Sequence, residues 1–522
     1  MSIESLGALF MLMVFSFMQA SCYKPEKPVN SPRDSITIGQ ITSFKTLNPL
    51  LEFSGVSSQI VDIIFDGLIR RGDEGNILPG LAVSWEMNKG GQEWVFYLRQ
   101  GVKFHDGYPL TAADVEFTLN LLRDPNRGSP YSAVYQHINK IHVRDSYTID
   151  IQLARPSSSF IYDLTIGIVP MHLLQGKDMA HFNYHPIGTG PYRCIRWSSD
   201  EVELGANQDY FMGRAHIDRV VIRSFKNQDI AWAHLMQGEI DVFLSLRPSA
   251  YEIIKKISHF KVYSTIRPYY YLICFNLANP LFQDRRVRQA LNYAVDKQRI
   301  VNKVVKEKKL ISSGTIFPYS WAFDSTIKPY PCDPKKALKL LAEAGWQDTD
   351  GDHILDKNNQ PFEFQLFLPE GHDEMETASL MLMEQLSDIG VMVKAKKLPV
   401  DILSQEYLLT KEFEAIFLYI FSDSDPDKNY QFWHSSQIKN GFNMFSYRNS
   451  KIDQLLDEGR STTDREQRKE IYAHYQQHMK EDPPGIFLFW REMLIGVHAR
   501  FHGVKFSPFS STLDNIRKWY VP

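Results

Sequence analysis

The stretch Trp94-Val-Phe-Tyr-Leu-Arg-Gln-Gly-Val-Lys-Phe-His-Asp-Gly-Tyr-Pro-Leu-Thr-Ala-Ala-Asp-Val-Glu-Phe-Thr-Leu119 contains a strand signal, a turn and a helix start in close succession. Its first residues, 94–98, are typical of a half-buried strand. The turn at residues 105–107 ends on glycine, which adopts backbone conformations that other residues avoid. Thr111 and Asp114 have the spacing of a capping box, and an apolar helix face follows them. The stretch therefore predicts a strand followed by a helix.

Strand and helix signals continue to alternate along the rest of the chain. Further strands are predicted around residues 36–38, 148–153 and 362–366, because apolar and polar residues alternate there. Helices are predicted after Asp333-Pro334 and after Asp464, where a capping side chain precedes an apolar stripe. This mixture indicates an α/β or α+β protein with several lobes.

The composition limits the class of protein. The chain has 522 residues and a formal net charge of −3, and 43% of its residues are hydrophobic. At about 150 residues per domain, this length predicts about three domains or two large lobes, and the hydrophobic content excludes a wholly disordered chain. The balanced charge argues against a nucleic-acid-binding protein. Four scattered cysteines exclude a disulfide scaffold, and we expect Cys194, Cys274 and Cys332 to be small buried hydrophobic residues.

The N-terminus carries a predicted export signal. Residues 6–18 form an apolar run that fits a signal peptide and is too short for an ordinary membrane-spanning helix. Small residues directly before Cys22 resemble a bacterial lipobox, in which the cysteine is lipidated. Gln19 stands where leucine is usual, and residues 1–5 are not basic, so a plain secretory signal is the alternative. We predict a signal peptide at residues 1–21 and a flexible tether at residues 22–35, which are rich in proline and charge.

Several motifs, taken in their order along the chain, resemble extracellular solute-binding protein family five. This family comprises the oligopeptide-, dipeptide- and nickel-binding proteins of bacterial ABC importers. The resemblance covers about residues 36–520. Besides the stretch quoted above, it rests on the segments Pro79–Glu86, Gly188–Tyr192, Asn276–Asp296, Asp333–Trp346, Leu386–Val391, Asp425–Asp427 and Glu481–Pro483.

The resemblance implies an α/β, two-lobed periplasmic-binding-protein fold of type II, in its large three-domain variant, with a ligand cleft between the lobes. The chain is expected to cross between the lobes near Arg267-Pro268 and near Trp490-Arg491-Glu492, and the lobes are expected to close by hinge motion. The expected division is domain I at residues 36–78, 186–267 and 491–522, domain II inserted at residues 79–185, and domain III at residues 268–490.

The resemblance also implies the function. The protein is expected to be an exported, non-enzymatic monomer without a cofactor that captures peptides and delivers them to the permease of an ABC importer. Its expected contact with the membrane is a lipid anchor only, and no nucleic acid is expected as a partner.

One carboxylate is implied as the ligand contact. Peptide-binding members hold the ligand amine with an aspartate just before an Asp-Pro pair, and Asp423 matches that position. A buried carboxylate that faces an ammonium group forms a charge-assisted pair. This segment has one residue fewer between its acids than the family pattern, so Asp425 is the alternative. A solvated turn ending at Pro426 is a further interpretation of both acids.

Main-chain and aromatic contacts complete the predicted site. The backbone of residues 42–45, which include Phe44, and of residues 420–422, which include Phe421, could flank an extended ligand as neighbouring strands. Such pairing tolerates varied side chains. Aromatic walls are predicted from Tyr270 and Trp433, together with their neighbours Tyr269, Tyr271 and Phe432. For each of these residues the alternative is that its side chain is buried in the core, where most aromatic residues lie.

Residues 348–356 carry acids at alternate positions, as oxygen-rich calcium loops do. An EF-hand loop requires glycine at its sixth position and glutamate at its twelfth, and this chain has His353 and Asn359 there. A charged surface hairpin is therefore favoured, and no metal is predicted.

Other functions remain open at this point. The same fold could bind a nickel chelate, an oligosaccharide or another solute, or could serve as a sensor or chaperone that presents its ligand to a partner other than a permease. An exported hydrolase is less favoured, because the chain has no local signature of a nucleophile elbow or a catalytic metal.

Overall fold

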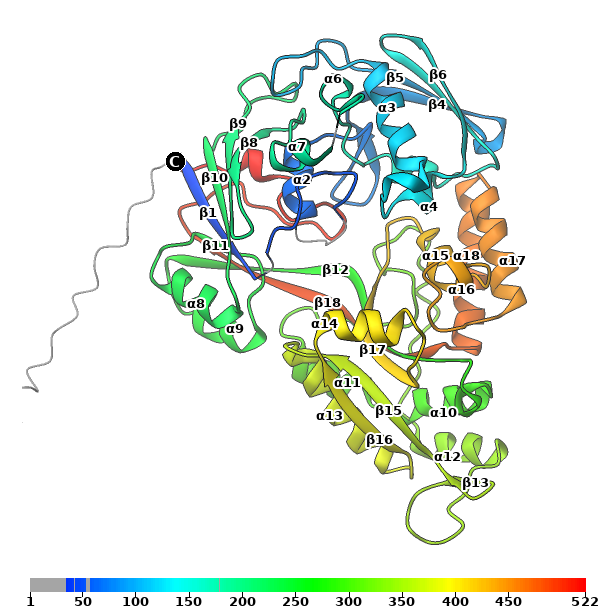
Figure 1. The fold of residues 1–522 in the computed structure, drawn as a ribbon. Helices are drawn as coiled ribbons and strands as arrows, with labels where there is room; N and C mark the ends of the chain where they lie inside the picture. The colour runs from blue at the N-terminus through cyan, green and yellow to red at the C-terminus, as the bar shows by residue number, and fades with distance from the viewer. Residues whose placement is uncertain (1–33, 42, 53–56, 178) are drawn as a thin grey trace, which may run out of the picture.

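The structure is a computed structural model, and it describes residues 34–41, 43–52, 57–177 and 179–522. Figure 1 shows two lobes joined by two long strands, β12 and β18. A ten-stranded mixed sheet runs through both lobes in the order β16-β15-β17-β12-β18-β11-β1-β10-β9-β8. In that order, the strands span Met392–Leu398, Glu363–Pro369, Ala415–Phe421, Phe260–Phe275, Gly485–His498, Val242–Phe243, Ser35–Gln40, Arg219–Ser224, Glu201–Ala206 and Tyr192–Trp197.

The first lobe also contains a separate four-stranded antiparallel sheet in the order β4-β5-β7-β6. These strands span Ala82–Asn88, Glu93–Leu98, Thr148–Leu153 and Ile138–Asp145. A short hairpin of β2 (Ile69–Arg71) and β3 (Ile77–Pro79) precedes this sheet in the chain. Helices of the first lobe that matter for the site are α2 (Ser58–Ile64), α3 (Ala112–Arg123), α4 (Ser132–Tyr135) and α5 (Phe160–Asp163).

Helices cover both faces of the sheet in the second lobe, as Figure 1 shows. One set packs in a core with one face of β12 and comprises α10 (Arg285–Ala294), α11 (Lys297–Val304), α12 (Pro334–Glu343) and α13 (Asp373–Ser387). The other set packs in a second core and comprises α15 (Lys428–Trp433), α17 (Ser450–Ser461) and α18 (Arg465–Glu481).

The sequence of β12 explains how both cores form on one strand. Tyr271, Ile273 and Phe275 lie in the first core, whereas Tyr270, Leu272 and Cys274 lie in the second. Successive side chains of a strand point to opposite faces of the sheet, so an unbroken apolar run buries alternate residues on each side.

The two long strands change their pairing register at the junction between the lobes. Residues 260–266 of β12 pair with residues 492–498 of β18, Tyr270 pairs with Trp490, and regular pairing resumes at Leu272 with Phe487. One register shift therefore falls at residues 267–269 and 491, near the predicted crossings, and a second lies between Tyr270 and Leu272. A local break in a ladder leaves fewer backbone hydrogen bonds to hold the strands straight.

The local signals in the sequence correspond to elements of the structure. Thr111 and Asp114 form the capping box of α3, and Asp333 and Asp464 cap α12 and α18 with their side chains. The strands predicted at residues 94–98, 148–153 and 362–366 are β5, β7 and β15. The predicted α/β, two-lobed periplasmic-binding-protein fold is confirmed.

One prediction about the cysteines is wrong. Cys274 is buried and Cys194 is partly buried, but Cys332 is exposed. It lies in the loop directly before Asp333, the N-cap of α12, where the helix has not yet begun to pack. A cysteine in the loop just before a helix can therefore stay exposed, although its side chain is small and apolar.

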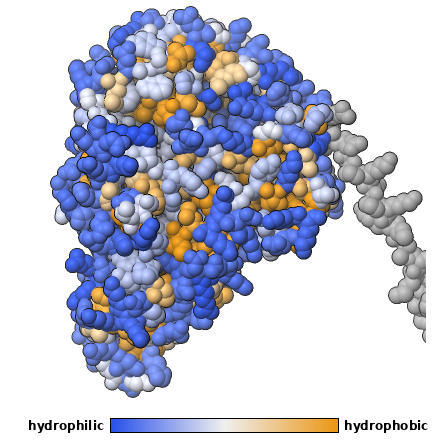
Figure 2. Space-filling view, turned by 180° about the vertical axis from the view of Figure 1, so that it is seen from behind, coloured by the Kyte–Doolittle hydropathy of each residue, from blue (hydrophilic) through white to orange (hydrophobic). Residues whose placement is uncertain are grey.

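The face opposite to that of Figure 1 is mainly hydrophilic, with apolar residues in several separate patches (Figure 2). No helix in the described part of the chain is long and apolar enough to cross a membrane.

Gly188 fixes α2 by close approach of two backbones. A Cβ atom built on Gly188 would lie 2.0 Å from the carbonyl oxygen of Ile64. We expect Gly188→Ala to lower the free energy of unfolding by about 1–3 kcal/mol, because backbone must shift to admit the methyl group. Gly314→Ala is the matched control, since its Cβ would meet nothing within 4 Å. Urea denaturation compares the two; equal midpoints would contradict the expectation.

Candidate functional site

Two adjoining cavities lie where the lobes meet. The inner cavity has a volume of about 320 Å³, and the outer cavity has a volume of about 870 Å³. Both fall in the size range of small-molecule sites, about 300–1,000 Å³. The cavities share one wall, which both lobes build from Val134, Tyr162, Asp163, Asp423 and Lys428. A ligand in this space would therefore contact both lobes.

The segment after β17 carries three acids at alternate positions, and each of them faces its own arginine. Asp423 pairs with Arg71, which donates from both terminal nitrogens, including an Nη2–Oδ2 bond of 2.9 Å. The other two pairs are bidentate and lie within the second lobe: Arg468 donates to Asp425 at 2.8 Å and 2.8 Å, and Arg460 donates to Asp427 at 2.9 Å and 2.9 Å.

Arg71 differs from the other two arginines because it belongs to the opposite lobe. It lies on β2, 352 positions before Asp423, and also donates to the Ser424 hydroxyl at 2.9 Å and to the Tyr162 carbonyl at 3.2 Å. Its guanidinium lies 5.3 Å from the centre of the Tyr162 ring. Asp423 is only 4% exposed. The Arg71–Asp423 pair is therefore a buried ion pair across the cleft.

Two further contacts cross between the lobes beside this pair. Lys428 Nζ lies 3.7 Å from Asp163 Oδ1, and the Ser158 backbone N–H donates to the Arg460 carbonyl at 3.3 Å. Burial raises the pKa of Asp163 to about 6, against the effect of Lys428, which lowers it. The lobes therefore meet through charged and polar groups on both sides of the shared wall.

The protonation of the other acids reflects their partners. Burial raises the pKa of Asp425 above its ordinary value, although Arg468 opposes this effect. Burial acts in the same direction on Asp427, but Arg460 outweighs it and the pKa of Asp427 is lowered.

The structure brings some of the predicted site residues together. Asp423 lines both cavities, Asp425 borders the outer cavity, and Phe421 lines the inner cavity. Both carboxylate oxygens of Asp423 accept from Arg71, so a ligand amine at this position would have to displace the guanidinium. The role of Asp423 or Asp425 as amine partner stays a prediction.

Two predicted aromatic contacts, Tyr270 and Trp433, and the side chain of the predicted main-chain contact Phe44 lie in cores and line neither cavity. Tyr270 and Trp433 are 1% and 0% exposed, and the Trp433 indole donates to the Tyr270 hydroxyl at 3.2 Å. Tyr270 is buried because β12 has packed helices on both faces. Phe44 is 3% exposed and packs in the core of the first lobe, while its backbone N–H bonds to Ser199. The neighbouring Thr42 and the predicted lipidation site Cys22 lie outside the described residues.

Several cavity residues were not identified from the sequence. Arg71, Asp62, Asp163 and Lys428 line the inner cavity. Only Lys428 is close in sequence to a predicted site residue. These residues come together only because α2, β2, α5 and α15 meet at the cavity. A local sequence pattern cannot reveal that these distant elements lie side by side.

One edge of β17 is open next to the inner cavity. β15 pairs with β17 only at Ala415 and Ile416, whereas β12 pairs with β17 along the whole length of β17. Among the described strands, none pairs with that second edge from Phe417 to Phe421. Unpaired main-chain donors and acceptors at a sheet edge can take up an extended chain as a further strand.

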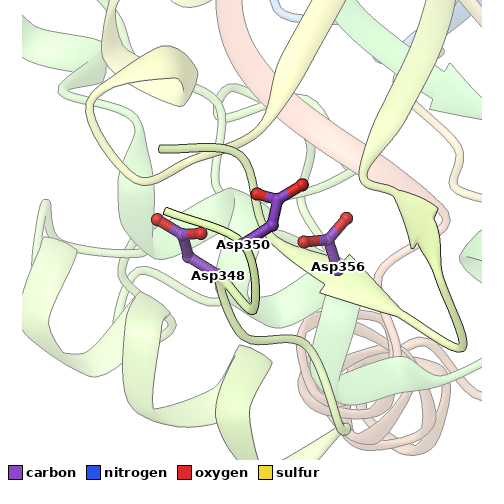
Figure 3. Close-up of side chains that lie close together, drawn as sticks. All are labelled: Asp348, Asp350 and Asp356. Atoms are coloured by element: carbon purple, nitrogen blue, oxygen red, sulfur yellow. The ribbon is translucent and has the colours of Figure 1, made fainter. Parts of the chain in front are cut away.

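The acidic loop has the geometry of a self-bonded turn. The carboxylates of Asp348, Asp350 and Asp356 lie within 4.8 Å of one another (Figure 3). Asp348 accepts backbone N–H groups of Gly351 and His353 at 2.7 Å and 3.1 Å. A two-stranded hairpin, β13 (Asp356–Lys357) and β14 (Gln360–Pro361), follows directly. These contacts support the hairpin interpretation of the segment.

His105 has a structural environment. Its Nε2 donates to the Gly190 carbonyl at 3.0 Å, and its Nδ1 accepts from the Gly188 N–H at 3.2 Å. Burial lowers its pKa to about 4, so the ring is neutral near pH 7. This arrangement agrees with the interpretation of residues 105–107 as a turn.

Known proteins share this architecture. Residues 76–441 match the family described as bacterial extracellular solute-binding proteins, family 5 Middle. The oligopeptide-binding protein AppA of Bacillus subtilis is 29% identical over 99% of this chain and 98% of its own length. The solved complex of AppA from Bacillus subtilis with a nonapeptide has a TM-score of 0.82 at 30% identity and covers 94% of this chain and 100% of its own.

A second solved structure is similar to the same extent. NikZ from Campylobacter jejuni in complex with Ni(L-His) has a TM-score of 0.84 at 28% identity and covers 94% of this chain and 100% of its own. The resemblance recognised in the sequence is confirmed. This chain belongs to the bacterial extracellular solute-binding proteins of family 5.

Proposed function

We propose that the protein is the substrate-binding component of an ABC importer, that it captures peptides between its lobes, and that it delivers them to a membrane permease. The observation that carries the proposal is the pair of adjoining cavities, which receive residues from both lobes. A ligand that contacts both lobes favours the closed arrangement, because only closure supplies all its contacts.

Peptides fit this site better than other solutes for one structural reason. The open edge of β17 ends at Phe421 on the inner cavity, so an extended main chain could pair there while its side chains enter the cavities. Similarity to the nonapeptide complex of AppA supports the same ligand class. A nickel chelate is the second candidate, because NikZ in complex with Ni(L-His) is similar over the same share of the chain.

The proposed division into domains follows the expected boundaries: domain I at residues 36–78, 186–267 and 491–522, domain II at 79–185, and domain III at 268–490. The register shifts of β12 and β18 support hinge residues near 267–269 and 491. We also propose a monomer without catalytic activity that is anchored by a lipid on Cys22. Mass spectrometry of the mature N-terminal peptide would test the anchor.

Calorimetric titration tests the ligand class directly. Purified protein is titrated with alanine-based peptides of three to nine residues, with Ni²⁺–histidine and with an oligosaccharide mixture. We expect micromolar binding of peptides, which corresponds to about −8 kcal/mol, and no heat with the other two ligands. Binding of the nickel chelate or the oligosaccharides without peptide binding would contradict the proposed ligand class and leave the family assignment in place.

A further inference from the structure

Asp62 is a carboxylate in the inner cavity that the proposed peptide contacts leave unused. It lies on α2 and lines the cavity, to which its side chain is accessible. The surrounding protein is nevertheless close enough that burial raises the pKa of Asp62 to about 7. A carboxylate that is accessible from a cavity and whose charged form is disfavoured gains stabilisation when a cation enters.

The two cations that line this cavity are engaged elsewhere. Arg71 is bidentate to Asp423, and Lys428 lies 3.7 Å from Asp163. By contrast, Asp62 forms no ion pair with any residue in the described part of the chain.

Three other groups influence Asp62 from nearby. Among them, the nearby Ser511 favours the ionised carboxylate and lowers the pKa of Asp62, whereas the charge of Asp514 raises it. Arg267 has the smallest effect, and its guanidinium donates to the carbonyls of Ser507 and Ser510 at 3.0 Å and 2.9 Å. Among the carboxylates that line the cavity, Asp423 and Asp163 face cations of the protein, whereas Asp62 has no cation within ion-pair distance among the described residues.

Tyrosine rings form much of the remaining wall. The hydroxyl groups of Tyr131 and Tyr135 donate to the backbone carbonyls of Glu52 and Asp163, which commits these donors to the protein. Their rings line the cavity together with Tyr162. Aromatic rings attract ammonium and guanidinium groups through their negative faces. A carboxylate within an aromatic wall is an arrangement that selects a cation.

We infer that the inner cavity is a subsite for a cationic group of the ligand, and that Asp62 is the counter-ion that selects it. The ligand group is an ammonium or a guanidinium, carried either by the N-terminus of a peptide or by a lysine or arginine side chain. The inference rests on the proposed peptide function. It assigns Asp62 to a charged group of the ligand, whereas the edge of β17 would pair with the amide groups of the peptide main chain.

Calorimetry with matched tripeptides tests the subsite and distinguishes the two sources of charge. The probes are Lys-Ala-Ala, its acetylated form, Ala-Ala-Ala and acetyl-Ala-Ala-Ala, titrated at pH 8 into the full protein, Asp62→Asn and Asp62→Glu. The control variant is Asp209→Asn, an exposed aspartate outside both cavities. Thermal denaturation confirms that each variant is folded.

We expect Asp62→Asn to weaken binding of the cationic probes by about tenfold or more, as a charge-assisted hydrogen bond predicts. Acetyl-Ala-Ala-Ala should change by less than about threefold, and Asp62→Glu should retain part of the selectivity. A loss confined to free-amine probes assigns the N-terminus, and a loss confined to lysine probes assigns the side chain. Equal losses for charged and uncharged probes, or no loss, would overturn the role of Asp62 alone. Absence of binding by every probe to the wild-type protein would overturn the peptide function and the subsite with it.

Discussion

Replacing Arg468 with methionine is expected to lower the free energy of unfolding by about 3–5 kcal/mol. Arg468 makes two hydrogen bonds of 2.8 Å to Asp425, and Asp425 is 2% exposed. Without the guanidinium, a buried carboxylate would remain with no counter-ion, and its desolvation would no longer be offset. Urea denaturation followed by tryptophan fluorescence measures the change.

The pH dependence of this variant has a defined sign. Burial already raises the pKa of Asp425 above 3.8, and loss of Arg468 removes a group that lowers it. A carboxyl group whose pKa is higher in the folded state destabilises folding at pH values above its unfolded pKa. The loss of stability in Arg468→Met should therefore shrink as the pH falls from 8 toward 5.

Two variants make this test specific. Arg299→Met removes an arginine whose ion pair with Glu384 is exposed and 3.3 Å long, and its cost should stay below about 1 kcal/mol. The double variant Arg468→Met, Asp425→Asn should lose less than the sum of its single changes, because it removes the uncompensated charge. A cost for Arg468→Met as small as that of the control would show that the buried pair is not needed for stability.

Replacing Arg71 with alanine is expected to open the cleft and to weaken peptide binding by about 30-fold or more. Truncation of one partner in a buried charge pair costs about 2–5 kcal/mol, and each 1.4 kcal/mol is a factor of ten. In the closed arrangement Asp423 would be buried without its partner, whereas in an open one water could solvate it. The fraction of closed protein falls, and the apparent affinity falls with it.

Small-angle scattering and calorimetry measure these two effects on the same protein. We expect a larger radius of gyration for ligand-free Arg71→Ala than for the wild type, and a similar loss of affinity for free and acetylated peptides. Arg196→Ala is the control, because its partners Glu201 and Glu203 lie in its own lobe. A smaller loss for free-amine peptides would instead support Asp423 as the amine partner, and an unchanged radius and affinity would refute a role for the pair in closure.

Local sequence signals were sufficient for most elements of the fold. The capping residues Thr111, Asp333 and Asp464 act within one helical turn, so the local sequence is enough to predict where those helices begin. The order of the motifs then supplied the two-lobed architecture through the resemblance to a known family.

The site was harder to predict because its contacts join distant segments. Asp423 was identified from its place before Asp425-Pro426, but its partner Arg71 lies 352 positions earlier and has no motif of its own. The place of the predicted aromatic residues was hard to predict for a different reason. Tyr270 lies on a strand with helices on both faces, and a run of tyrosines does not reveal whether one face will stay open.

The order of strands in the large sheet has a consequence for synthesis. β18, made of residues 485–498, lies between β11 and β12 in the middle of the sheet. Neither lobe can complete its part of the ten-stranded sheet until almost the whole chain has left the ribosome, although domains generally fold from the N-terminus during synthesis. Pairing between such distant segments is also slow to form. The chain therefore stays incompletely folded for most of its translation. This delay leaves time for an extracytoplasmic protein to be exported before its native structure has formed.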